Sequence, residues 1–100
     1  MTRLELHEKL VDVLGSRYVY FQPPTGVKME YPCIVYSVEG SYRVDADNGI
    51  YKRKRQYHLT HITRDPDDAT PDRIEEMRYC RLKNQTVIER LYHTHFTIYF

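Results

Sequence analysis

The sequence predicts a single α+β domain over residues 1–100, in which a mostly antiparallel or mixed sheet of four to five strands is packed by two helices on one side. Three observations predict this fold. Apolar residues recur at helical spacing near the start of the chain, and most later segments alternate as strands do. The predicted elements follow the order α-β-β-β-α-β-β. A hundred residues is also close to the commonest domain size, so one hydrophobic core is expected.

The first helix is predicted over residues 3–14. Thr2 and Glu5 have the spacing of a capping box, in which each side chain can bond the backbone amide of the other residue. An apolar stripe follows at helical spacing, formed by Leu6, Leu10, Val13 and Leu14. Gly15 then stands where a left-handed residue commonly ends a helix.

Two strands and a connection are predicted next. Residues 17–21 are β-branched and aromatic, and the two prolines that follow end the strand because proline cannot donate to a ladder. Residues 33–38 are apolar at nearly every position, which predicts a central strand covered on both faces. Residues 39–49 contain turn-forming residues and are predicted to be a long hairpin connection.

Residues 51–63 alternate imperfectly and predict an unusually long strand. We expect residues 57–63 to lie in the sheet. The first half of the strand is too charged for a core, so we expect it to project from the sheet as part of a long β-hairpin arm. Its four consecutive cations, called the basic run below, are Lys52, Arg53, Lys54 and Arg55.

A second helix and two more strands complete the prediction. After a turn at residues 65–68, Thr70 is predicted as the N-cap and Pro71 as the first helical residue, with acidic residues early in the helix. Residues 79–83 predict a short strand. Residues 92–100 alternate cleanly and predict a strand that runs to the last residue.

The composition favours a protein that acts by binding other proteins. Fifteen basic and fourteen acidic side chains leave a net charge of +1, which gives little long-range attraction for a polyanion. The ten tyrosines are unusual, because each ring supplies apolar area while its hydroxyl needs water or a partner. Such residues suit half-buried sheets and protein interfaces.

The sequence predicts a soluble, cytosolic chain with reduced thiols. The first residues lead straight into a charged amphipathic segment, without the features of a signal peptide. No apolar run approaches the roughly 20 residues needed to span a bilayer, so we expect no membrane partner. Cys33 and Cys80 lie far apart in the sequence, and we expect both to be buried and reduced.

No catalytic, cofactor-binding or metal site is predicted. His58 and His61 are three positions apart and face opposite ways on a strand, while His93 and His95 share a face but lack a third ligand nearby. The stretch that begins at Asp45 fails the calcium-loop pattern, which needs glycine at its sixth position and glutamate at its twelfth. No cysteine or serine has the local setting that activates a nucleophile, so we expect no enzyme.

One feature favours a different class of function. Tyr51 and Tyr57 flank the basic run, and aromatic residues beside cations can stack on bases and neutralise phosphates. A small module that binds RNA or single strands through this segment is therefore the alternative to a protein-interaction role. The nearly neutral total charge favours the protein-interaction role.

Several segments together resemble a known family. They are the opening helix, residues 18–24 (YVYFQPP), residues 31–36 (YPCIVY), the long strand 51–63 with the following 64–67 (RDPD), and residues 92–99 (YHTHFTIY). In pattern and order the chain resembles the small tail-completion or tail-terminator proteins of long-tailed bacteriophages, also called head-to-tail joining or minor capsid proteins. None of these segments is a catalytic motif, so the resemblance carries no active site.

The resemblance implies a structural virion protein. Members of this family form a ring, typically a hexamer, that caps the tail tube and joins it to the head connector. The implied partners are other copies of the chain, the tail tube protein and a head-completion or neck protein, with DNA passing through the lumen without sequence recognition. The implied location is the virion neck or tail, and the host cytoplasm during assembly. Tube-capping and neck-joining roles both stay open.

A ring needs a heterologous interface, in which one surface of each subunit meets a different surface of the next. We expect the basic run to approach acidic residues of a neighbouring copy, or alternatively to face the lumen. The acidic candidates, called the acidic segment below, are Asp67, Asp68, Asp72 and Glu75.

Overall fold

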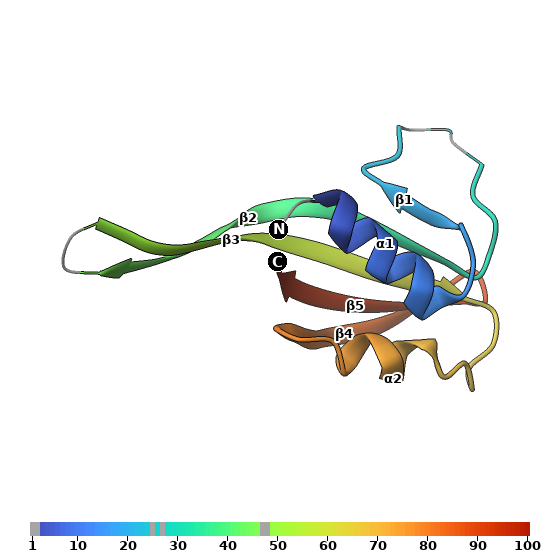
Figure 1. The fold of residues 1–100 in the computed structure, drawn as a ribbon. Helices are drawn as coiled ribbons and strands as arrows, with labels where there is room; N and C mark the ends of the chain where they lie inside the picture. The colour runs from blue at the N-terminus through green and yellow to red at the C-terminus, as the bar shows by residue number, and fades with distance from the viewer. Residues whose placement is uncertain (1–2, 25, 27, 47–48) are drawn as a thin grey trace.

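The computed structural model describes residues 3–24, 26, 28–46 and 49–100, with side chains described outside residues 41–54. In this part of the chain there are two helices and five strands (Figure 1). The elements are α1 (Arg3–Leu14), β1 (Val19–Phe21), β2 (Cys33–Ala46), β3 (Gly49–Thr63), α2 (Thr70–Glu75), β4 (Cys80–Ile88) and β5 (Leu91–Tyr99). The predicted α+β class and the element order are both confirmed.

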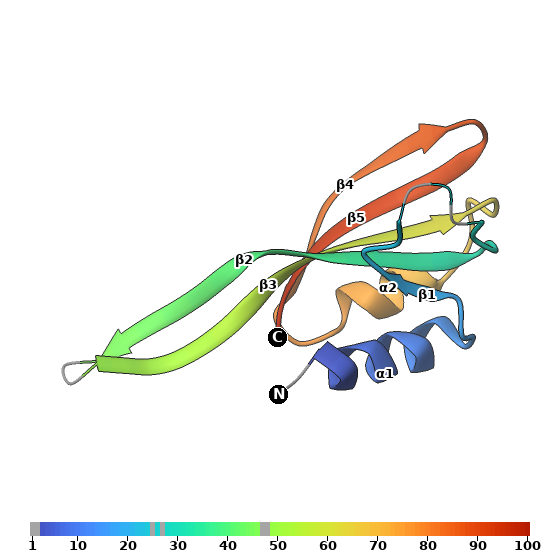
Figure 2. The ribbon, with the colours of Figure 1, turned by 90° about the horizontal axis from the view of Figure 1, so that it is seen from above.

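The five strands form one mixed sheet in the order β1-β2-β3-β5-β4. The short β1 runs parallel to β2, and the other three pairings are antiparallel. Both helices lie on one side of the sheet, as predicted (Figure 2). The other side carries no helix of the described part of the chain and is called the open face below. None of the described helices is long and apolar enough to cross a membrane.

The core lies between the helices and one face of the sheet. Leu6 and Leu10 of α1 are fully buried, as is Ile74 of α2. They pack against alternate residues of the three central strands, namely Ile34, Tyr36, Tyr57, Leu59, Phe96 and Ile98. Because side chains alternate across a strand, the intervening residues of these strands point to the open face.

The prediction for α1 is confirmed at both bounds. Its apolar stripe faces the sheet, with Val13 and Leu14 partly buried at the edge of the core. Gly15 has a φ of +80°, and its amide donates to the carbonyl of Val11 at 2.8 Å, which ends the helix. Thr2, the predicted N-cap, lies outside the described residues.

The prediction for residues 39–49 was wrong for most of its length. Residues 39–46 continue β2 and pair with β3 as far as Ala46 and Gly49, while residues 47–48 lie outside the description. The turn-forming Gly40 and Asp45 sit instead at two register shifts of the ladder, after Val38 and after Val44. A β-bulge tolerates such residues, because it interrupts the regular pairing without ending the strand.

Residues 33–38 are covered on both faces only at their start, where Cys33 and Ile34 are fully buried, and not along the whole run as predicted. Both helices lie on one side, so Val35 on the open face is only half-buried. Val38 points to the helix side but lies near the base of the arm, and it is 39% exposed. Continuous hydrophobicity therefore did not indicate a doubly covered strand in this sheet.

The start of α2 also differs from the prediction. Ala69 is the N-cap, and Thr70 is a buried residue at the first helical position. The capping role falls to Asp68, whose Oδ1 accepts the amide of Thr70 at 2.9 Å. Pro71 lies in the first turn, where a missing amide costs nothing.

The last two strands form a tighter hairpin than predicted. β4 extends to Ile88, well beyond residue 83, and β5 begins at Leu91. The two-residue turn between them consists of Glu89 and Arg90, with φ values of 51° and 67°. Two successive left-handed residues are typical of a type I′ turn, which normally uses Asn and Gly.

Candidate protein-interaction site

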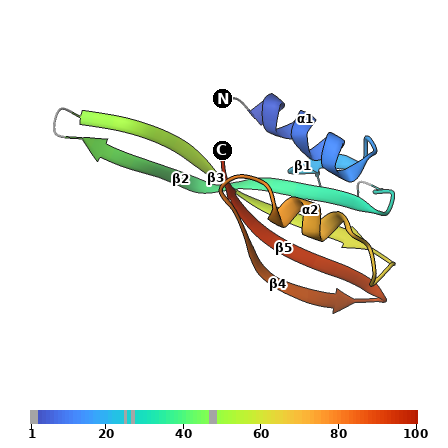
Figure 3. The same ribbon diagram turned by 60° about the horizontal axis from the view of Figure 1, so that its bottom comes forward.

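The basic run lies in a two-stranded arm that projects from the sheet (Figure 3). β3 is paired on both sides from Gln56 onward, where Gln56 is in register with Tyr99 of β5. At the base of the arm, Arg55 and Phe100 exchange two backbone hydrogen bonds of 3.2 and 2.9 Å. Beyond that point β3 pairs only with β2, in the described part of the chain. The predicted β-hairpin arm is thus present.

The register of the arm places each cation of the basic run opposite a residue of β2. Lys52 pairs with Val44, Arg53 with Arg43, Lys54 with Tyr42, and Arg55 with Ser41. The backbone of the run is therefore extended and paired. Among the four side chains only Arg55 is described, and it is exposed.

The acidic segment lies just past the other end of β3. Asp67, Asp72 and Glu75 are exposed. Asp68 is partly buried and already has partners, because its Oδ1 caps α2 and its Oδ2 lies 3.7 Å from Nε2 of His61. Burial would raise the pKa of Asp68, but hydrogen bonds from the Thr70 amide and hydroxyl, with His61 and Thr63 adding to them, hold the pKa below its ordinary value. Asp68 therefore stabilises the fold, and the other three acids are the ones available to a partner.

The acidic segment does not lie in one place relative to the arm. In Figure 1 the arm extends to the left and the turn before α2 lies at the far right, whereas α2, with Asp72 and Glu75, runs back from that turn toward the base of the arm. The strand from Arg55 to Thr63 spans roughly 25 Å at about 3.3 Å per residue. A single chain therefore cannot bring the basic run onto the turn at residues 65–68. Contact between the run and that turn requires two copies, and it stays a prediction.

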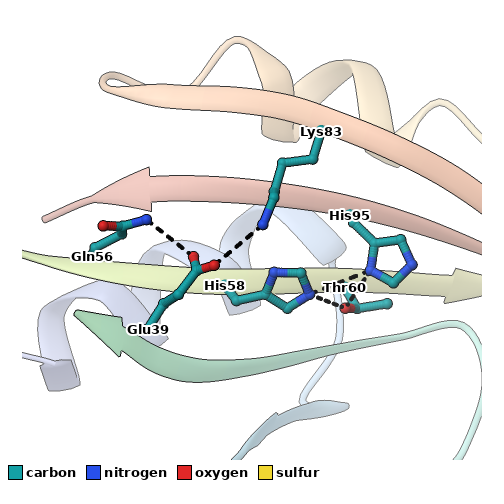
Figure 4. Close-up of polar contacts among 6 residues, drawn as sticks. All are labelled: Glu39, Gln56, His58, Thr60, Lys83 and His95. Atoms are coloured by element: carbon teal, nitrogen blue, oxygen red, sulfur yellow. Dashed lines mark hydrogen bonds and ion pairs between the residues drawn. The ribbon is translucent and has the colours of Figure 1, made fainter.

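A polar network at the base of the arm was not predicted (Figure 4). Both carboxylate oxygens of Glu39 are bonded, to Nζ of Lys83 at 3.2 Å and to Nε2 of Gln56 at 3.2 Å. Burial would raise the pKa of Glu39, but the bonds from Lys83 and Gln56 keep it below its ordinary value. Lys83 stands at the register shift of β4 between Leu82 and Asn84, and such a bulge re-aims a side chain. The network joins β2, β3 and β4 across the open face.

Two histidines meet beside this network. Nε2 of His58 lies 3.3 Å from Nδ1 of His95, and Oγ1 of Thr60 lies 3.2 Å from each of these nitrogens (Figure 4). The other ring nitrogen of His95 lies 3.2 Å from Oγ1 of Thr86. Burial, followed by the charges of nearby His58, His93 and Lys83, lowers the pKa of His95. His95 is therefore neutral at physiological pH and can both donate to one hydroxyl and accept from the other.

The expectation that His58 and His61 face opposite ways is confirmed. His61 points into the helix side and is fully buried, with no hydrogen bond to either ring nitrogen. Burial lowers its pKa, and the opposing effect of Asp68 is smaller. Within the described residues, no three His, Cys, Asp or Glu side chains are grouped so that they could hold a metal ion.

Tyr57, one of the two aromatic residues in the nucleic-acid alternative, is not available for stacking. It is 2% exposed and packs in the core, with its ring 6.1 Å from that of Tyr36. The side chain of Tyr51 lies outside the described part.

The two cysteines are free thiols, and only one of them is fully buried. Cys33 is buried as expected, whereas Cys80 is partly exposed. Burial raises the pKa of each thiol to about 11, and Glu75 adds to the effect at Cys80. Both thiols therefore stay protonated near neutral pH and are weak nucleophiles.

No protein-family model matches the chain, and no curated protein matches it either. The function is therefore inferred from the arm, from the acidic segment and from the resemblance in pattern described above.

Proposed function

We propose that the chain is a structural protein of a tailed bacteriophage that assembles head-to-tail into a ring at the head-tail junction. There it would cap the tail tube and join it to the head connector. The observation that carries the proposal is a basic run on an arm that projects from one end of an elongated subunit, which measures 51 × 26 × 23 Å, while the exposed acids of the acidic segment lie on the body, on α2 and on the turn before it at the other end. The resemblance to tail-terminator proteins supplies the biological setting.

An arm that complements a different surface of the same subunit favours a heterologous contact, the kind a ring needs. The arm of one copy reaches beyond its own sheet, so its cations can approach Asp67, Asp72 and Glu75 of the next copy. Each exposed ion pair contributes only about 0–1 kcal/mol, so the contact depends on several pairs acting together. Assembly should therefore weaken as salt is raised.

The test combines charge reversal with rescue. The variant Arg53→Glu/Arg55→Glu should lower the association constant in sedimentation velocity and abolish rings in negative-stain electron micrographs. A second variant, Asp72→Lys/Glu75→Lys, should not associate on its own but should associate when it is mixed with the first variant. The matched control is Lys9→Glu/Arg17→Glu, which reverses two exposed cations of α1 and the following turn.

Two results would overturn the proposal. The first is unchanged association of the reversed variants. The second is a wild-type chain that stays monomeric at all concentrations, also with tail tubes present. A gel-shift assay over a range of salt concentrations tests the nucleic-acid alternative. Tight and salt-sensitive binding of single-stranded RNA or DNA by the wild-type monomer would support a nucleic-acid-binding function instead.

A further inference from the structure

β4 forms an edge of the sheet whose outer side is unpaired. Within the described residues β4 pairs only with β5, along its whole length from Cys80 to Ile88. The edge at the other side of the sheet, β1, has only three residues. β4 also exposes large apolar side chains, with Leu82 48%, Val87 59% and Ile88 56% exposed. A long edge of this kind, with exposed apolar side chains near both of its ends, is a template for an added strand.

The ladder shows which backbone groups of β4 point outward. The two-residue turn is closed by the pair Ile88–Leu91, so the next pair, Val87–Tyr92, is of the non-hydrogen-bonded kind. At the other end the amide of Tyr99 donates to the carbonyl of Tyr79, so Tyr79–Tyr99 is a hydrogen-bonded pair. Because the two kinds of pair alternate along the ladder, Leu82–Phe96 is a non-hydrogen-bonded pair, like Val87–Tyr92. The backbone N–H and C=O groups of Leu82 and Val87 therefore point away from β5.

Acidic side chains of α2 lie beside the start of this edge. Glu75 is close enough to Cys80, the first residue of β4, to raise the pKa of its thiol. Asp72 and Glu76 are exposed on the same short helix. The cation of Lys83 on β4 is already paired with Glu39. A strand added at this end of β4 would thus meet three carboxylates of α2 next to unpaired backbone groups, together with the exposed cations Arg73, Arg78 and Arg81.

We propose that β4 accepts the arm of a second copy as an added strand, with the basic run of β3 along the outer edge of β4. This inference rests on the proposed function and specifies its contact. The arm fits because, among the residues that the structure describes, its β3 strand has no second partner beyond Arg55 and so has one free edge of its own. Pairing joins two edges that are otherwise unsatisfied, and it brings the basic run to the acids of α2. One sheet would then continue from each subunit into the next.

The test removes one outward amide without disturbing the internal ladder. Leu82→Pro deletes an N–H that points away from β5, at the end of β4 beside the acids of α2, and an edge strand tolerates such a proline. Leu82→Ile is the matched control, because it keeps the amide and an apolar side chain of the same size. In sedimentation velocity, Leu82→Pro should lower the association constant about tenfold relative to Leu82→Ile. Circular dichroism and urea unfolding of the monomers check that both variants fold.

A second pair of variants gives an answer even where the proline variant does not fold. Leu82→Lys should weaken association because it repels the basic run, whereas Leu82→Glu should leave it intact or strengthen it. Equal weakening by both would indicate that β4 pairs with β4 of a second copy, and no effect of either would mean that this edge is not used; each result overturns the inference. Sensitivity to Arg53→Glu/Arg55→Glu without sensitivity at Leu82 would retain the proposed ring and reject only this edge.

Discussion

His61 offers the sharpest test of the folded structure, because it is a fully buried imidazole without a hydrogen bond. A buried polar group without a partner costs about 1–3 kcal/mol. Leucine has a similar volume and no polar atom, so His61→Leu should raise the free energy of unfolding at pH 7.5 by about 1 kcal/mol. The nearby Asp68 keeps its bond to the Thr70 amide in the variant, so the cap of α2 is not lost.

The same substitution should change the pH dependence of stability. Burial lowers the pKa of folded His61 below its ordinary value of 6.5, so the unfolded chain takes up the proton first as the pH falls. The stability that neutral His61 supports is thus complete above pH 6.5 and declines as the pH falls toward the folded pKa. The limiting slope is about 1.4 kcal/mol per pH unit for one proton. Wild type should therefore lose up to about 1.4 kcal/mol more than His61→Leu between pH 7.5 and 5.5.

Urea unfolding followed by circular dichroism at pH 7.5, 6.5 and 5.5 measures this difference. His7 and His95 also have lowered pKa values, so both proteins should lose some stability in acid, and only the difference between them reports on His61. Asp68 does not interfere, because its pKa is held below the ordinary value of a carboxyl group, outside this pH range. Parallel loss of stability by wild type and variant, or a variant less stable than wild type at pH 7.5, would refute the assignment.

Three further predictions follow from single features. Glu89→Asn/Arg90→Gly should stabilise the chain by about 1–2 kcal/mol, because both residues have positive φ and the new pair is preferred there; an unchanged or lower thermal midpoint would contradict the type I′ turn. Leu10→Ala should cost about 2–5 kcal/mol in urea unfolding, because the side chain is fully buried between α1 and the sheet; a loss below 1 kcal/mol would place it outside the core. In a thiol-exchange assay at pH 8, Cys33 should react only in urea and Cys80 slowly without it; rapid reaction of Cys33 in the folded chain would contradict its burial and raised pKa.

Local signals predicted the fold best where they did not depend on pairing. α1 was placed correctly because its stripe and Gly15 are determined by helix geometry alone. The hairpin of β4 and β5 was not placed correctly, because Glu89 and Arg90 are not residues typical of turns. They take left-handed conformations only when the flanking strands pair. Gly40 led to the opposite error. It is typical of turns and suggested a connection, but it lies at a bulge within β2.

In the candidate site, too, local features could be predicted from the sequence and features that depend on strand pairing could not. The basic run and the acidic segment were visible in the sequence, since each is a local cluster of charge. The meeting of His58 and His95 was not, because the two residues are 37 positions apart and come together only through the register of β3 with β5. Parity could have placed both on the open face, but only a known strand order brings them within 3.3 Å.

The geometry of the arm also bears on the kind of assembly. A contact between two different surfaces must either close into a ring or continue as a filament, and closure requires a rotation between successive copies. The arm does not continue straight from the sheet, because β2 has register shifts after Val38 and after Val44, and bulges bend and twist a strand. Figure 2 shows β2 and β3 bending, in the arm, away from the direction that the same two strands follow in the sheet. Pairing an arm with β4 of the next copy would therefore turn each subunit relative to the last, and the bend of the arm, more than the charges, would determine whether the assembly closes.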